Sequence, residues 1–160
     1  MAKEKDTKTN AMRILDRNNV VYKVNTYESD EFVDGKTIAD KLGQDYASSF
    51  KTLVTKGRSG DFYVFVIPIA EELNLKKAAK SVKEKSVEMV HVKDINSITG
   101  YIRGGCSPLG MKKQYDTVVH NSAKEFDEII ISGGRIGSQI IINPDELIRV
   151  IGGKYDDIVI

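Results

Sequence analysis

One lysine stands out among the residues that could do chemistry, because it lies inside a run of residues typical of a β-strand. Lys51 follows Phe50 and precedes Thr52, Leu53 and Val54. A lysine at such a position either carries its ammonium group to solvent on an apolar stem or lines a polar cavity inside the protein. The residues themselves leave both interpretations open.

Two glycine-rich segments could hold an oxygen atom of a ligand. The first spans residues 99–110 and the second spans residues 132–137. Glycine lets the backbone approach a ligand closely and adopt positive φ angles, so that N–H groups can point at a carbonyl or phosphate oxygen. Tight turns between strands use the same residue type, and this alternative stays open for each segment.

Two matches to catalytic motifs fail because their context is wrong. The run from Ser48 to Lys51 spells S-x-x-K, but that motif begins a helix, whereas residues 50–54 are typical of a strand. The run from Gly105 to Lys112 resembles a P-loop, yet Met111 interrupts it and no Ser or Thr follows the lysines. The sequence therefore predicts neither an acylating serine nor a P-loop nucleotide site.

Metal and thiol chemistry have little support. The two histidines, His91 and His120, are far apart and lack the spacing of paired metal ligands, so we expect no metal site and no cofactor. Cys106 is the only cysteine, which excludes an internal disulfide. A dyad of this cysteine with a histidine is conceivable, but a cysteine in a Gly-Ser-Pro loop is more often an inert small residue.

The composition is that of a globular chain, with 160 residues, 41% hydrophobic and 29% charged. This length suits one domain spanning residues 1–160. Residues 1–10 are polar and lysine-rich, without the apolar core of a signal peptide, and no apolar run approaches the length of a membrane span. We expect a cytoplasmic protein without a membrane partner.

The net charge is +1, from 24 Lys+Arg against 23 Asp+Glu, so any site for a polyanion must come from local clustering. Lysines gather between Lys76 and Lys85. They are either the solvated face of a helix or a contact for nucleic acid, and the sequence does not decide between the two.

Hydrophobic periodicity predicts about seven strands, at residues 20–26, 50–55, 62–67, 87–92, 117–120, 128–132 and 139–142. It predicts four or five helices, at residues 9–19, 35–42, 73–82, 123–126 and 144–151. Residues 57–61 have turn chemistry and join two strands into a hairpin. The strand at residues 87–92 is apolar on both sides, which predicts that both of its faces are covered.

Seven short strands in one domain favour an α+β fold with a mixed curved sheet or barrel and helices packed outside, because closure removes exposed strand edges. A doubly wound sheet is disfavoured, since the strands at residues 50–55 and 62–67 are too close for a helical crossover.

The motifs together resemble the YbaK/EbsC family, which are stand-alone relatives of the editing domain of bacterial prolyl-tRNA synthetases. The resemblance runs in order from about residue 11 to residue 151. It is carried by Phe-Lys-Thr-Leu at residues 50–53, Leu-Lys-Lys-Ala-Ala at 75–79, Thr-Gly-Tyr at 99–101, Gly-Gly at 104–105, Ser-Pro-Leu-Gly at 107–110 and Ser-Gly-Gly at 132–134.

The resemblance implies a mixed β-barrel with surrounding helices. It also implies an activity that removes cysteine from mischarged Cys-tRNA(Pro), with Cys-tRNA(Cys) as a second candidate substrate. Such proteins often act with prolyl-tRNA synthetase, and the thiolate of the substrate is thought to attack its own ester. That route needs only positioning and oxyanion stabilisation from the protein. Two alternatives stay open: a hydrolase of Ala-tRNA(Pro) that uses a positioned water, and a non-catalytic module that binds tRNA or a protein partner.

The resemblance also implies roles for individual residues. The expected catalytic residues are Lys51, Gly104 and Gly105, and the expected substrate-binding residues are Tyr27, Thr52, Ser132, Gly133 and Gln139. Gln139 stands where relatives often carry an acid, which puts any carboxylate role there in doubt. The segment between Tyr27 and Gly43 is shorter than in some relatives, so an assignment of Phe32 as a binding aromatic is weak.

Overall fold

The computed structural model describes residues 8–29 and 33–160 as five α-helices, two short 3-10 helices and eight strands. In chain order the elements are α2 (Asn10–Arg17), β1 (Tyr22–Thr26), α3 (Gly35–Leu42), β2 (Phe50–Gly57), β3 (Phe62–Pro68), α4 (Leu75–Ser81), β4 (Val87–Met89), η1 (Val92–Asp94), α5 (Ile95–Thr99), β5 (Asp116–His120), η2 (Asn121–Glu125), β6 (Ile129–Ser132), β7 (Ser138–Ile142), α6 (Pro144–Ile151) and β8 (Lys154–Asp156).

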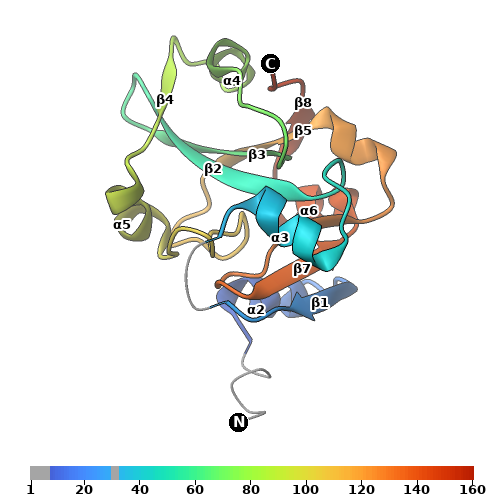
Figure 1. Cartoon of the computed structure of the whole chain (residues 1–160). Coiled ribbons are helices and arrows are strands. Elements are labelled where there is room, and N and C mark those ends of the chain that lie inside the picture. Colours follow the sequence, from blue (N-terminus) through green and yellow to red (C-terminus); the bar gives the residue numbers. More distant parts are fainter. Residues whose placement is uncertain (1–7, 30–32) are drawn as a thin grey trace.

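The described strands form two sheets, a three-stranded one in the order β1-β7-β6 and a five-stranded one in the order β4-β2-β3-β5-β8. Figure 1 shows the smaller sheet, with β1 and β7, below the long β2–β3 hairpin. The α+β class is as predicted, but the expected single curved or closed sheet is wrong. Among the described residues the two sheets are linked by one isolated parallel bridge, between Ser49, which precedes β2, and Ile130 of β6, so the ladder of hydrogen bonds does not close into a barrel.

The predicted hairpin is confirmed, since β2 and β3 pair in antiparallel register from Phe50 opposite Pro68 to Lys56 opposite Phe62. The turn closes with a hydrogen bond of 2.8 Å from the Gly57 N–H to the Asp61 carbonyl. Both faces of β3 are buried. The hairpin therefore forms the centre of the larger sheet, with β4 and β5 on its two sides.

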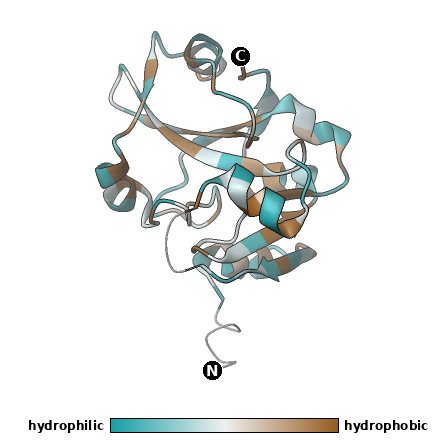
Figure 2. Ribbon diagram, viewed as in Figure 1, coloured by the Kyte–Doolittle hydropathy of each residue, from teal (hydrophilic) through white to brown (hydrophobic). Residues whose placement is uncertain are grey.

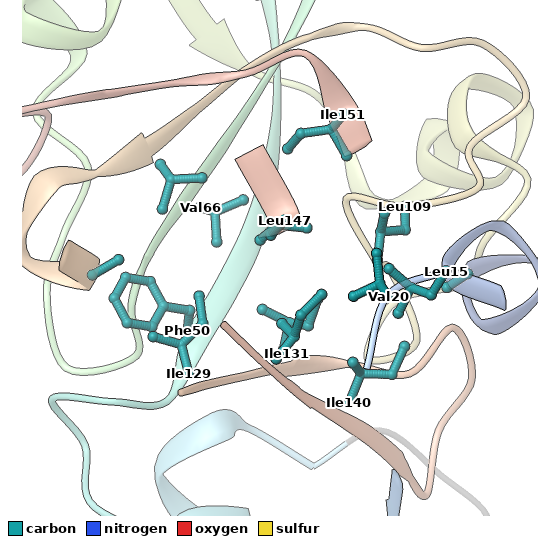
Figure 3. Close-up of a cluster of buried hydrophobic side chains, with 14 of the residues drawn as sticks. Leu15, Val20, Phe50, Val66, Leu109, Ile129, Ile131, Ile140, Leu147 and Ile151 are labelled. Atoms are coloured by element: carbon teal, nitrogen blue, oxygen red, sulfur yellow. The ribbon is translucent and has the colours of Figure 1, made fainter. Parts of the chain in front are cut away.

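Successive β3 residues enter two different hydrophobic clusters. Val64 and Val66 belong to the cluster drawn in Figure 3, which also contains Phe50, Ile131 and Leu147. Phe65 and Ile67 face the other side of the sheet, in the cluster that includes Ala78 and Ala79 of α4. This alternation follows from the two-residue period of a strand. Figure 2 shows hydrophilic residues along the outer part of α4, whose apolar side is buried.

Residues with strong capping preferences stand at the boundaries of two helices. Asn143 caps α6 by accepting hydrogen bonds from the Asp145 and Glu146 N–H groups, with Pro144 at the first turn. Gly43, with φ +67°, ends α3 in the left-handed conformation. These local signals predict boundaries well because they depend on residues that are adjacent in the chain.

The expectation that residues 87–92 form a strand covered on both sides is wrong. β4 has three residues, pairs only with β2, and lies at the edge of its sheet, and the Met89 side chain is 45% exposed. The short β8, which pairs in parallel with β5, and the one-turn α5 were not predicted. Elements of three to five residues are too short for a periodic pattern to reveal them.

Candidate active site

A cavity of about 650 Å³ lies between the two sheets. Residues of β2 form one wall, and the start of α3 and the segment after β3 form part of the rim. The opposite side comes from the ends of β6 and β7 and from the first glycine-rich segment. The cavity thus collects segments that are far apart in the sequence.

Lys51 lines this cavity, at the point where β2 pairs with Ile67 of β3. Its side chain is half-buried, and its ammonium group has no hydrogen bond or ion pair within residues 8–29 and 33–160. Burial lowers the pKa of Lys51, while Glu72 and Glu71 oppose that shift and Lys36 adds to it. The structure therefore places this cation in a cavity, with its hydrogen-bonding capacity unused by the described residues.

The first glycine-rich segment contributes Gly104 to the cavity and keeps Gly105 away from it. Gly104 is exposed, has φ +85°, and its N–H has no protein partner among the described residues. Gly105 is buried, and its N–H donates to the Ile102 carbonyl at 2.9 Å. A Cβ at Gly105 would lie 2.9 Å from the Arg135 Cα, so this glycine lets the two glycine-rich segments pack backbone against backbone.

In the second glycine-rich segment, too, one of the two expected site residues lines the cavity and the other does not. Ser132 lines the cavity, whereas Gly133 is buried behind it. The Gly133 N–H donates to the Ser138 carbonyl at 2.9 Å, and the Gly133 carbonyl accepts a hydrogen bond of 2.6 Å from the Thr9 hydroxyl. The segment is therefore fixed at its base by β7 and by the start of α2.

Tyr27, Thr52 and Gln139 all line the cavity. The Tyr27 N–H donates to the Gly137 carbonyl at 2.9 Å, which joins the end of β1 to the second glycine-rich segment. Gln139 is only 9% exposed. Its side-chain amide is hydrogen-bonded to two other amides, those of Asn25 and Gln44.

Some lining residues were missed by sequence reasoning. They are Gln44, Lys36, Arg103, Glu71 and Glu72, together with apolar residues of β4, η1 and α5. Arg103 lies within the first glycine-rich segment, whereas the others lie outside the motifs, and only the tertiary structure brings them to the same cavity. Phe32 lies outside the residues that the structure describes.

Cys106 also lines the cavity, but its environment does not activate it. Burial raises the pKa of the Cys106 thiol to about 11. A thiol with such a pKa is almost entirely protonated at neutral pH, and the thiolate is the nucleophilic form. Neither histidine lines the cavity, and the His120 Nδ1 instead accepts a hydrogen bond from the Ile158 N–H.

The described residues lack two features. In that part of the chain no group of three or more His, Cys, Asp or Glu side chains is arranged to hold a metal ion. No helix among residues 8–29 and 33–160 has the length and apolar character needed to cross a membrane.

Comparison with known proteins assigns the chain to a family. Residues 33–150 match the model of the aminoacyl-tRNA editing domain. The chain is 43% identical over 160 residues to an Enterococcus faecalis protein named "Putative Cys-tRNA(Pro)/Cys-tRNA(Cys) deacylase EbsC", and the match covers 99% of this chain and 98% of that protein.

Two solved structures, at 20% identity, share the fold. One is a hypothetical protein, with a TM-score of 0.87 over 95% of this chain and 100% of the other. The second is described as "a putative trans-editing enzyme for prolyl tRNA synthetase", with a TM-score of 0.80 over 96% of this chain and 99% of the other. The sequence, the family model and the fold agree. The chain therefore belongs to the aminoacyl-tRNA editing domain family, and within it to the YbaK/EbsC group of aminoacyl-tRNA deacylases.

Proposed function

We propose that this chain acts as a single editing domain that removes cysteine from Cys-tRNA(Pro), and that the thiol of the bound cysteine makes the first attack. The observation that carries the proposal is the Lys51 ammonium group, which lines the cavity without a partner in the described part of the chain. A cation left unpaired in a half-buried position is costly unless it serves a ligand. The acylated end of a tRNA supplies the oxygen atoms that would pair with it.

The chemistry can proceed without a nucleophile from the protein. The cysteinyl thiol loses its proton, and its sulfur attacks the carbonyl carbon of the same aminoacyl ester. The bond from that carbon to the terminal ribose oxygen then breaks, the oxygen gains a proton, and a thiolactone leaves. Lys51 and the Gly104 N–H would stabilise the negative charge on the carbonyl oxygen in the transition state. Holding the two reacting groups close together supplies the remaining acceleration.

The cavity residues support a reaction in which the substrate supplies the nucleophile and the protein supplies binding and charge stabilisation. Burial raises the pKa of Cys106 to about 11, which disfavours an enzyme thiolate. Tyr27, Thr52, Ser132 and Gln139 add hydrogen-bonding groups along the same cavity. We assign them to binding the terminal adenosine and the aminoacyl group, whereas Gly105 and Gly133 support the walls from behind.

The names of the relatives support the choice of substrate. The Enterococcus faecalis protein is named for Cys-tRNA(Pro) and Cys-tRNA(Cys), and one structural neighbour is described as a trans-editing enzyme for prolyl-tRNA synthetase. We therefore extend the proposal to a complex with that synthetase, in which the chain receives the mischarged tRNA before it leaves.

A deacylation assay with tRNA(Pro) charged with cysteine, serine or alanine tests the proposal. We expect cysteine to be removed much faster than serine, because the two side chains are similar in shape but a hydroxyl is a far weaker internal nucleophile. Equal rates for cysteine and serine would require an activated water and contradict the substrate-thiol route. Preferential cleavage of Ala-tRNA(Pro) would contradict the substrate assignment, and binding without deacylation would contradict the catalytic proposal itself.

A further inference from the structure

Three side-chain amides from separate segments form a cluster, and two of them, Gln44 and Gln139, line one wall of the cavity. Asn25 belongs to β1 and lies directly opposite Gln139 of β7 in the antiparallel register. Gln44 follows the end of α3. The Gln139 Oε1 accepts hydrogen bonds from the Asn25 Nδ2 at 3.0 Å and from the Gln44 Nε2 at 2.7 Å. In return, the Gln139 Nε2 donates to the Gln44 Oε1 at 3.1 Å.

In this cluster the hydrogen bonds occupy some of the amide donors and acceptors and leave others without a partner among the described residues. A side-chain amide has two N–H donors and one oxygen with two lone pairs. The Gln139 oxygen already accepts two hydrogen bonds, so it has no capacity left for a ligand. One N–H of Gln139 and one of Gln44 have no partner among the described residues, and both side chains line the cavity. The wall is therefore uncharged and offers donors.

The backbone holds Gln44 in place for this contact. Gly43 has φ +67°, which ends α3, and the Gln44 N–H donates to the Ala39 carbonyl at 2.8 Å. Gln44 thus follows a closed helix end, a defined conformation that fixes the direction of the chain. Its amide forms two of the three hydrogen bonds that orient Gln139. Without Gln44, rotation about the last bond of the Gln139 side chain would interchange the amide oxygen and nitrogen at low cost.

We propose that Gln44 is a positioning residue of the deacylase, which holds the Gln139 amide in the orientation that presents an N–H group, and no charge, to the acylated end of the tRNA. The ester and ribose oxygens of that end accept hydrogen bonds. A fixed donor on this wall orients the ester toward Lys51 of β2 and toward Gly104, which line the same cavity. The inference rests on the proposed location of the reaction in this cavity, and it assigns a role to a residue outside the motifs that identify the family.

A double-mutant cycle tests the inference. The proteins are the wild type, Gln44→Met, Gln139→Met and the double variant, because methionine keeps the length of the side chain and removes its hydrogen bonds. The assay is single-turnover deacylation of whichever of the Cys-, Ala- and Ser-charged tRNA(Pro) the wild type cleaves fastest. We expect Gln44→Met to lower the rate constant at saturation about tenfold. The double variant should be no slower than Gln139→Met, because Gln44 acts through Gln139.

The concentration dependence separates positioning from a general loss of structure. We expect the half-saturating enzyme concentration to change little, because most of the tRNA contacts lie elsewhere, and the thermal unfolding temperature to stay near that of the wild type. Gln44→Asn is a second variant, which keeps the amide group but is too short to bridge to Gln139. Gln114→Met is the matched control, since the Gln114 side chain is exposed and, within the described part of the chain, donates only to the Tyr115 carbonyl.

Two results would overturn the inference. One is a folded Gln44→Met or Gln44→Asn variant with the wild-type rate; the other is a double variant whose loss equals the product of the two single losses. Lys51→Ala, assayed in parallel, distinguishes this failure from a failure of the proposed function. If that variant retains its activity, the role proposed for Lys51 is wrong, and the cycle still decides whether Gln44 positions Gln139.

Discussion

Lys51 illustrates how a single residue can be unfavourable for stability and useful for binding. Its ammonium group lies in the cavity, and burial lowers its pKa. A lowered pKa means that the folded protein disfavours the charged form of this lysine relative to the unfolded chain. The charge at neutral pH therefore opposes folding, and a negatively charged or oxygen-rich ligand would relieve that cost.

Replacing Lys51 with alanine should separate the two effects. We expect Lys51→Ala to lower kcat/KM for deacylation by about 10²–10³-fold, the usual effect of removing one group that stabilises an oxyanion. We expect its unfolding temperature to be equal to or higher than that of the wild type, because the desolvated charge is gone. Lys56→Ala is the control, since Lys56 lies on the same strand but is exposed and outside the cavity. Retained deacylation in Lys51→Ala would contradict the proposed role.

Cys106 leads to a prediction about pH. Its pKa is raised to about 11 by burial, so the thiolate fraction at pH 7–8 is far below that of a free cysteine. We expect alkylation by iodoacetamide, followed by mass spectrometry, to be slow in the native protein at pH 8 and to accelerate as the pH approaches 11. Denatured protein at pH 8 should react much faster.

The same environment implies that Cys106→Ser retains deacylation activity. An inactive but folded Cys106→Ser variant would contradict the substrate-thiol route, because it would identify the protein thiol as the nucleophile. Fast alkylation of native protein at pH 8 would contradict the burial of the thiol.

At the scale of the elements, α2 is connected to the site by the residue that caps it. The Thr9 hydroxyl accepts a hydrogen bond of 3.3 Å from the Met12 N–H and donates one of 2.6 Å to the Gly133 carbonyl. One side chain thus begins the helix and fixes the base of the second glycine-rich segment. The packing of α2 and the shape of the cavity wall should therefore be coupled.

Changing Thr9 should reveal this coupling. We expect Thr9→Ala to lower the free energy of unfolding by about 1–2 kcal/mol, because both the helix cap and a second hydrogen bond are lost. It should also lower the deacylation rate several-fold by loosening the segment that carries Ser132. Thr9→Ser keeps the hydroxyl and should resemble the wild type in urea denaturation and in the deacylation assay. Equal losses in the two variants would show that the hydroxyl is unimportant.

At the scale of the whole molecule, a net charge of +1 provides no strong long-range attraction for a polyanion. We therefore expect binding of tRNA to depend on cations close to the cavity, among them Lys36, Lys51 and Arg103. The lysines of α4 are a different group. α4 packs Ala78 and Ala79 into the core and leaves Lys76 and Lys80 exposed, and none of its residues lines the cavity.

We therefore expect charge reversal on α4 to have little effect. The double variant Lys76→Glu, Lys80→Glu should bind charged tRNA with a dissociation constant within about twofold of the wild type at 0.15 M salt, measured by filter binding. Lys36→Glu, on the rim of the cavity, is the comparison and should weaken binding substantially. A large loss of affinity in the α4 variant would identify that helix as part of the tRNA contact.

Much of the fold could be predicted because it depends on local patterns. The apolar run at residues 62–67 predicts a strand, and the turn residues at 57–61 predict the hairpin that joins it to the preceding strand. The Asn143 cap and Gly43 mark helix ends within one residue. The closed sheet could not be excluded, since closure depends on how many hydrogen bonds form between β2 and β6, which are far apart in the chain.

The sequence by itself determined the family motifs, and with them the lysine, the glycine-rich segments and a minority of the residues that line the cavity. Only the tertiary structure separated Gly104, which faces the cavity, from Gly105, whose N–H is used within its own loop. Only the tertiary structure also joined Asn25, Gln44 and Gln139. Strand periodicity and capping act between neighbours in the chain, so a sequence displays them. Which N–H groups remain free, and which amides meet at one wall of a cavity, depends on contacts between distant segments that exist only in the folded protein.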